Sequence, residues 1–341
     1  MDKASFISKY NGLLSKVQTL TKQTNKMSVL IIQQRPNPND VEYVFPAIRE
    51  SISNIVGFVG VTDNTFIDDI ITMSIGVFDK MVLDTDLKRN NSREIVESVI
   101  GISREKNVDL AFYSDIETWI SASINFIYRV EKNCISGKKV LLIGRNPLAT
   151  RMVLELINRN VEVYLNPNEY KGSGIFPYNN NSSLELESGM VRFLDSAEDR
   201  KFDVLLGCSI NENNGFLHDF EDFSFKSIYD IGVNNFNKEF IRKVTDCGGH
   251  AFRSDDRAGI AGIVLNIMET DYLIENNMGR KNIGEINVVS GGVIGQEGDV
   301  VVDNVNDPVV VLGVASGEGT FKSDLSEEDM RKLNKIKSLI Q

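Results

Sequence analysis

The chain has 341 residues, of which 42% are apolar and 25% are charged, and its formal net charge is −11. This composition is typical of a globular protein with sizeable buried cores, and two domains are the first expectation at this length. An acidic chain has no general attraction for nucleic acids or anionic membranes, so we expect a small-molecule substrate and neither of those partners. No uncharged apolar stretch approaches eighteen residues, so we expect no membrane span.

The cysteines, histidines and first residues bear on the compartment and on metals. Cys134, Cys208 and Cys247 are far apart and odd in number, which favours reduced thiols over a disulfide framework. No Cys/His spacing is typical of a zinc site, so we expect no metal. The start, MDKASFISKYNGLL, lacks the apolar core of a signal peptide. We therefore expect a cytoplasmic protein.

Residues 1–135 are predicted to form an N-terminal α/β domain, because strand-like apolar runs alternate with helical patterns. Helical periodicity is present at 4–24, 41–55, 93–106 and 115–130, the last with Asp115 as a plausible cap. Short runs rich in β-branched residues predict strands at 28–34, 80–86 and 108–114.

Residues 136–257 contain the clearest unit of the sequence. GKKVLLIGRN leads from a turn glycine through an apolar strand to Gly144, and a helix with proline near its first turn follows. VEVYL (161–165) completes a βαβ unit of about 30 residues, the length that a right-handed crossover needs. Further strands are predicted at 202–208, 226–232 and 250–253, with a helix before the last and an apolar helix at 258–276.

After residue 280 the pattern changes to valine-rich runs separated by Gly, Asp and Asn. These runs predict a small antiparallel β unit, followed by a helix whose start has a capping box at Ser326 and Asp329. Residues 281–341 are therefore predicted to be a β-rich extension with a terminal helix, which covers a cleft or contributes to a dimer contact.

The turn at Gly144 is the best candidate for a dinucleotide site. Backbone N–H groups and the helix dipole at such a strand-to-helix turn attract phosphate. Only the first glycine of G-x-G-x-x-G is present, so the βαβ context supports the site more strongly than the motif itself. A strand-to-helix turn without a ligand is the alternative. Arg145 can pair with a 2′-phosphate, and no acidic residue stands at the tip of the second strand. Both points favour NADP, with NAD possible, and an ordinary surface arginine is the alternative.

Three other features have a functional and a structural interpretation. Cys208 follows a strand, where a buried structural thiol is far commoner than a nucleophile. The charged run 253–257 precedes the apolar helix and either contacts substrate or is a solvated surface. Asp84 is an acid–base candidate if desolvation raises its pKa, whereas Asp84 and Asp86 could simply end a strand.

Several of these segments resemble the bifunctional methylenetetrahydrofolate dehydrogenase/cyclohydrolase family. PNPNDVEYVFPAIRES is similar to its P-A-S-x-x-Y-V-x-x-K-x-K helix, LIGRN to its V-I-G-R-S cofactor turn, and YDIGVNN to its I-D-V-G-I-N segment. DVLLGC is similar to D-I-V-I-A-A, and DDRAGIAG takes the place of P-G-G-V-G-P-M-T. The resemblance implies an N-terminal catalytic α/β domain, a Rossmann domain for NADP at 136–257, and a helix at 258–278 that returns to complete the first domain.

The departures from the family pattern fall mainly on its folate site. The catalytic lysine of the family falls on Ala47, although Arg49 keeps the second basic position, and the glutamine of V-Q-L-P-L falls on Asp84. Only Gly259 remains of the P-G-G-V-G-P-M-T loop, and the last 60 residues have no counterpart. We therefore expect a divergent member that keeps hydride transfer and lacks cyclohydrolase activity.

The resemblance and the residue patterns together name the expected site. The expected cofactor-binding residues lie at strand ends and at the glycine turn: Gly144, Arg145, Asn146, Pro147, Thr150, Cys208, Ile231, Gly232, Val233 and Asn234. The expected catalytic or substrate-contacting residues are Tyr43, Arg49, Asp84, Asp255 and Arg257.

The predicted function is an NAD(P)-dependent oxidoreductase, a homodimer acting on a small polar metabolite in an interdomain cleft. The substrate could be methylenetetrahydrofolate itself or a related C1 or amino compound. The alternative is a protein on the same fold that binds a dinucleotide or another ligand without catalysis. The fold alone does not choose between them.

Overall fold

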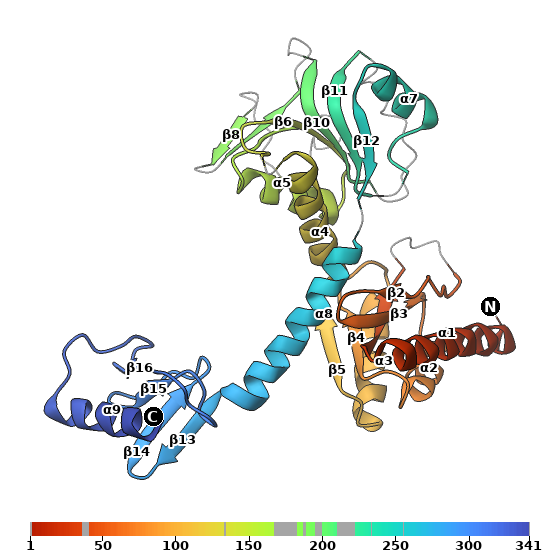
Figure 1. Cartoon of the computed structure of the whole chain (residues 1–341). Helices are drawn as coiled ribbons and strands as arrows, with labels where there is room; N and C mark the ends of the chain where they lie inside the picture. Colours follow the sequence, from red (N-terminus) through yellow and green to blue (C-terminus); the bar gives the residue numbers. More distant parts are fainter. Residues whose placement is uncertain are drawn as a thin grey trace. The chain divides into compact units, whose positions relative to one another are not determined.

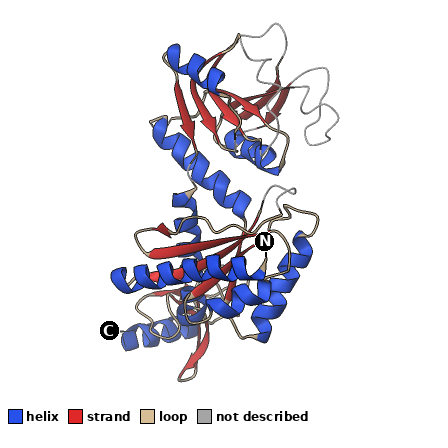
Figure 2. Cartoon of the chain, turned by 90° about the vertical axis from the view of Figure 1, so that its right-hand side faces the viewer, coloured by secondary structure: helices blue, strands red, loops and turns tan. Residues whose placement is uncertain are grey.

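A computed structural model shows two compact units, Met1–Ile263 and Val264–Gln341. It describes residues 2–35, 41–132, 134–166, 183–186, 189–194, 200–209, 222–232, 234–254 and 256–340. Figure 1 labels the helices and strands, and Figure 2 distinguishes them by colour. Among the described helices, none has both the length and the apolar character needed to cross a bilayer.

The first unit begins with a five-stranded sheet in the order β2-β3-β1-β4-β5. Its strands are β1 (Met27–Gln34), β2 (Arg49–Glu50), β3 (Asn54–Val61), β4 (Lys80–Asp84) and β5 (Leu110–Tyr113). All pairings are parallel except that of the edge strand β2 with β3. Its packing helices are α1 (Lys3–Thr24), α2 (Ile67–Ser74) and α3 (Ser92–Glu105), whose apolar faces share one core with the sheet.

The predicted helix at 41–55 is wrong. The chain forms no helix there, and the strand β3 begins at Asn54 with all eight residues buried. The run NIVGFVGV is rich in β-branched residues, which pack well in a strand buried on both faces. Pro46 also disfavours a continuous helix because it lacks a backbone donor. The helix α2 that follows was not predicted either.

The second sheet of this unit has seven strands in the order β12-β11-β10-β6-β7-β9-β8. Its strands are β6 (Lys139–Ile143), β7 (Glu162–Leu165), β8 (Ser183–Leu186), β9 (Gly189–Phe193), β10 (Lys201–Gly207), β11 (Ser224–Asp230) and β12 (His250–Arg253). All are parallel except the edge strand β8. Without β8, the order is that of the Rossmann fold, strands 3-2-1-4-5-6, so the predicted α/β fold class is confirmed. The pair β8–β9 was not predicted.

Side chains alternate between the two faces of this sheet, as the two-residue period of a strand requires. Leu142 and Leu206 pack with α4 (Asp115–Val130) and α5 (Pro147–Ile157). Leu141 and Leu205 face the opposite side, in the core that contains α7 (Lys238–Asp246). Both faces are therefore covered, as in doubly wound proteins.

The second unit is a small α/β module. Its sheet has the order β13-β14-β15-β16, formed by β13 (Gly279–Ile283), β14 (Ile286–Ser290), β15 (Val300–Val302) and β16 (Val311–Val314). The β14–β15 pairing is parallel, so the prediction of an antiparallel unit holds only for the other two pairings. The helix α9 (Glu327–Ile340) packs on this sheet, and its predicted capping box is confirmed by reciprocal hydrogen bonds between Ser326 and Asp329.

The helix α8 (Arg257–Tyr272), followed by a π-helical turn at Leu273–Asn277, connects the two units. Its first residues pack closely on α4. A side chain at Gly259 would have its Cβ only 2.8 Å from Thr118 O of that helix. The predicted domain limits at 135, 257 and 281 remain predictions.

Candidate functional site

Two edges of the first unit, one on each sheet, carry Asp84 and the described residues of the predicted cofactor site. In parallel sheets, ligands bind outside the carboxyl ends of the strands where the strand order reverses direction. In the Rossmann sheet this point lies between β6 and β10, whose carboxyl ends are followed by Gly144 and Cys208. In the first sheet it lies between β1 and β4, which end at Gln34 and Asp84.

The turn after β6 requires glycine. Gly144 has a φ of +128°, which residues with a side chain rarely adopt. A Cβ there would lie 2.9 Å from both Cys208 C and Ser209 N. Asn146 caps α5: its Oδ1 accepts from Ala149 N at 2.9 Å, and its Nδ2 donates to Cys208 O at 2.8 Å. The turn is therefore held directly against the end of β10.

A buried asparagine, Asn235, joins the ends of β10 and β11. Its Oδ1 accepts from Ser209 N at 2.8 Å, and its Nδ2 donates to Ser209 O at 3.0 Å and to Asp230 Oδ1 at 2.6 Å. Gly232 leaves room for this arrangement, since a Cβ there would lie 1.9 Å from Ser209 O. The second asparagine of YDIGVNN was the available signal for Asn235, which the sequence analysis did not select.

Ser209 is a second residue that the sequence analysis missed. The residue is only 1% exposed, and its hydroxyl has no hydrogen-bond partner among the described residues. A buried hydroxyl without a partner is costly, so such a group at a ligand-binding edge suggests a partner that arrives with the ligand. The helix N-terminus at Asn146 lies at the same edge, so the residues present are compatible with a dinucleotide there.

The remaining predicted cofactor residues lie around the same edge. Arg145, Pro147 and Asn234 are exposed, and Thr150 Oγ1 donates to Asn146 O at 3.3 Å within α5. Cys208 and Ile231 are fully buried, which agrees with the structural interpretation of the Cys208 thiol. Val233 lies outside the described residues. At the tip of β7 stands Asn166 rather than an acidic residue.

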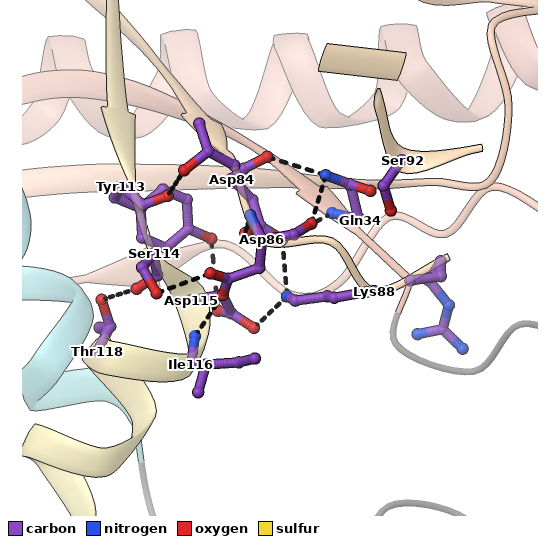
Figure 3. A network of polar contacts seen from close by, with 12 residues as sticks. Gln34, Asp84, Asp86, Lys88, Ser92, Tyr113, Ser114, Asp115, Ile116 and Thr118 are labelled. Carbon is purple, nitrogen blue, oxygen red and sulfur yellow. Dashed lines mark hydrogen bonds and ion pairs between the residues drawn. The ribbon is translucent and has the colours of Figure 1, made fainter. Parts of the chain in front are cut away.

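Figure 3 shows a buried polar network at the other edge, around Asp84. Gln34 N donates to Asp84 Oδ2 at 3.2 Å, and Gln34 Nε2 donates to the carbonyl oxygens of Asp84 and Asp86 at 3.1 and 2.9 Å. These bonds fix the carboxyl ends of β1 and β4 to each other.

Lys88 lies at the centre of this network and was not selected from the sequence. Its Nζ is 2.6 Å from Asp84 Oδ2 and 2.6 Å from Asp115 Oδ2. The three side chains are buried, with exposed fractions of 6% for Lys88, 0% for Asp84 and 8% for Asp115. One ammonium group is thus shared by two carboxylates, in surroundings where a charge without a partner would be unfavourable.

Burial raises the pKa of Asp84 to about 6, with Lys88 opposing the rise and the negative charge of Asp115 adding to it. Burial alone would lower the pKa of Lys88, but the carboxylates of Asp115 and Asp84 outweigh it, so that the pKa is raised. The desolvation on which an acid–base role of Asp84 depends is therefore present. Asp84 can exchange a proton near neutral pH while Lys88 stays charged.

The helix α4 connects this network to the cofactor edge. Its N-cap is Ser114, whose Oγ accepts from Glu117 N at 3.1 Å, so the prediction of Asp115 as the cap is wrong. The carboxylate of Asp115 instead pairs with Lys88. Glu117, in the first turn of α4, forms an ion pair with Arg151 of α5, and α5 begins at the glycine turn. The helices α4 and α5, which contact each other, thus begin at the Asp84 network and at the glycine turn, respectively.

Tyr43 lies in the core of the first sheet. It is 3% exposed, its ring packs against Phe6 and Phe66, and its hydroxyl donates to Asp63 O. Burial raises the pKa of the Tyr43 hydroxyl above its usual value. This placement gives Tyr43 a packing role, and its predicted contact with substrate is untested.

Arg49 and Arg257 lie at the edge strand β2 and at the start of α8, respectively. Arg49 forms an ion pair with Asp256 at 2.7 Å, and its guanidinium lies 4.9 Å from the centre of the Phe58 ring. Arg257 is exposed at the start of α8, and Asp255 lies outside the described residues. Of the four predicted catalytic residues that the structure describes, only Asp84 belongs to the buried network.

Comparisons with known proteins give likenesses in structure only. No family model matches the chain, and no curated protein matches its sequence. A hetero-hexameric glutamate dehydrogenase from Thermus thermophilus has 9% identity and a TM-score of 0.40, with 72% of this chain and 68% of that chain covered. The L-tryptophan dehydrogenase from Nostoc punctiforme has 11% identity and a TM-score of 0.36, with 72% and 74% covered.

The catalytic subunit of M. jannaschii aspartate transcarbamoylase has 14% identity and a TM-score of 0.37, with 72% of this chain and 88% of that chain covered. At these values the likenesses concern the fold and select no chemistry for this chain. Because no family model matches the chain, membership of the methylenetetrahydrofolate dehydrogenase family stays a hypothesis.

Proposed function

We propose that this protein is an NAD(P)-dependent oxidoreductase that transfers a hydride to or from a small polar metabolite. The observation that supports it best is the glycine turn at the strand-order reversal of the Rossmann sheet. The buried hydroxyl of Ser209, which has no hydrogen-bond partner in the part of the chain that the structure describes, lies at the same edge. A dinucleotide supplies both the phosphate for the turn and the polar groups for that hydroxyl.

The chain's own residues would divide the binding between two strand ends. The start of α5 would present its amides to the diphosphate, while Gly144 and Asn146 keep this turn against the end of β10. Ile231 and Gly232 at the end of β11 would line the nicotinamide side. When bound, the nicotinamide ring supplies the hydride donor or acceptor.

The Asp84–Lys88–Asp115 network would handle the proton that accompanies hydride transfer at a carbon bearing oxygen or nitrogen. Asp84, with a pKa of about 6, is close to the value at which a carboxyl group both gives and takes a proton efficiently. Lys88 would keep Asp84 largely ionised at neutral pH and stabilise negative charge on a substrate oxygen. Asp115 would hold Lys88 in place from the start of α4.

The finer parts of the proposal concern the cofactor and the substrate. Arg145 is exposed beside the turn, and Asn166 replaces the acidic residue that usually binds the ribose of NAD, so NADP is the proposed cofactor. Methylenetetrahydrofolate is the first substrate to test, followed by other C1 and amino compounds. A homodimer in the cytoplasm is the proposed setting.

Isothermal titration with NADP(H) and NAD(H) tests the proposal, followed by a turnover assay over a panel of metabolites. Arg145→Ala should weaken NADP binding by about tenfold or more and leave NAD binding unchanged, because a charge-assisted phosphate contact is lost. Arg159→Ala, at the other end of α5, is the matched control.

The two alternatives give different results in these assays. Equal NADP affinity in Arg145→Ala and the wild type would show that Arg145 does not contact the 2′-phosphate. Tight dinucleotide binding with no turnover of any metabolite would favour the binding protein over the enzyme. If neither dinucleotide binds at millimolar concentration, the oxidoreductase proposal fails.

A further inference from the structure

A groove of about 890 Å³ lies on the first unit between α1 and the segment 42–48. These elements are different from the strand ends that form the two candidate edges, and the function proposed above does not use the groove. Its volume is within the range of small-molecule sites in proteins. The helix α1 is the red helix in Figure 1.

One face of α1 forms a wall of this groove. Lys9, Gly12, Lys16 and Thr19 all line it and follow the spacing of one helical face, three or four residues apart. On this face Gly12 stands between the two lysines. The wall therefore has a gap of one side chain with an ammonium group one turn before it and another one turn after it.

The glycine in this gap is not explained by packing within the protein. A Cβ at Gly12 would meet no atom within 4 Å, so a larger side chain would fit the chain itself. Glycine in a helix interior is nevertheless unfavourable relative to alanine or leucine. The absence of a side chain at Gly12 would let another molecule lie directly across the helix at this position.

The floor and the rim of the groove indicate the chemistry of that molecule. Apolar side chains line the floor, among them Leu13, Phe45 and Ile48. At the rim, Lys9 and Lys16 form no ion pair or hydrogen bond with any residue that the structure describes. Two ammonium groups on one helical face, without a carboxylate partner among the described residues, attract an anion from outside.

We propose that this groove binds a small organic anion whose apolar body lies over Gly12 and whose acidic group lies between Lys9 and Lys16. Glu42 also lines the groove, on the opposite segment, and it orients the anion toward the lysines by repulsion. The site is independent of the dinucleotide edge.

Fluorescence titration of the full chain with 8-anilinonaphthalene-1-sulfonate, an aromatic sulfonate, tests the proposal. The wild type should bind the probe at one saturable site, with affinity that falls as salt is added. Gly12→Leu should bind at least tenfold more weakly and melt at the same or a higher temperature, because leucine favours the helix. Replacing Lys9 and Lys16 together by glutamine should weaken binding and remove most of its salt dependence.

Gly101→Leu is the matched control, since Gly101 is also an exposed helix glycine whose Cβ would meet nothing within 4 Å. It should bind the probe as the wild type does. Wild-type affinity in Gly12→Leu would overturn the proposal. So would a change in the sedimentation coefficient of Gly12→Leu with unchanged probe affinity, because the groove would then be a contact between copies of this chain.

Discussion

Replacing Lys88 by methionine removes the ammonium group that forms an ion pair with both Asp84 and Asp115. Methionine keeps the length of the aliphatic stem, so the change isolates the ammonium group. The carboxylates at the end of β4 and at the start of α4 then remain buried without this ammonium group. Removing one member of a buried ion pair costs about 3–5 kcal/mol, and we expect a loss of unfolding free energy of that size at pH 8.

The pH dependence of this loss follows from Asp84. Its pKa in the folded chain is about 6 against an ordinary 3.8, so the folded state binds the extra proton between these values. Stability therefore rises as the pH falls through this window, by about 3 kcal/mol for this group at 1.36 kcal/mol per pKa unit. Without Lys88 the pKa of Asp84 rises further, which extends the window to higher pH. The variant should consequently recover more stability than the wild type between pH 8 and pH 5.

Urea unfolding at pH 5 and pH 8, followed by the fluorescence of Trp119 in α4, measures both effects. Lys226→Met is the matched control, because Lys226 forms an ion pair with Asp203 at 2.6 Å but is 79% exposed. Its unfolding midpoint should stay close to that of the wild type at both pH values. The reasoning is refuted if Lys88→Met also keeps the wild-type midpoint at pH 8, or if its loss is the same at both pH values.

Two further substitutions probe the Rossmann edge. Ser209→Ala should weaken dinucleotide binding by roughly two- to tenfold and leave the free protein as stable as before or more so, since a buried hydroxyl without a partner is removed. Ser103→Ala, which removes another buried unpartnered hydroxyl in α3, should leave titration calorimetry unchanged, and equal losses in both variants would contradict the assignment. Gly144→Ala should lower the unfolding free energy by about 1–3 kcal/mol and abolish dinucleotide binding, whereas wild-type thermal stability would show that the turn tolerates a side chain.

Local signals were enough to find the elements at the Rossmann edge. The strand that ends at Gly144 is an uninterrupted apolar run, and the proline and capping asparagine that follow define the start of α5. A strand-to-helix turn of this kind depends on residues adjacent in the chain, so the sequence contains most of its determinants. The strand order that makes it a candidate ligand-binding edge depends on long-range pairing, and only the βαβ pattern suggested it.

The region around Tyr43 shows why the similarity of its sequence to a helical motif did not predict its backbone conformation. The spacing of Tyr43, Ala47 and Arg49 suggested a helix, but the eight buried residues of β3 pair in parallel with β1 along their whole length. This pairing requires an extended chain from Asn54, and the antiparallel strand Arg49–Glu50 precedes it closely. Long-range pairing therefore outweighed a local helical period, and the residues before it became a connection.

The residues missed at the candidate site share a physical cause. Lys88 and Ser209 are polar types that are usually exposed, and nothing in their neighbours in the chain shows that they are buried. Their burial comes from β-strands and helices that meet at each edge: α4 brings Asp115 to Lys88, and the turn after β6 comes close to Ser209. Both follow the carboxyl end of a strand that lies beside a reversal of strand order, which is where ligands bind in parallel sheets. A function that depends on those groups is therefore tested most directly by substitutions at Lys88 and Ser209, and less directly by substitutions at residues that the family pattern had selected.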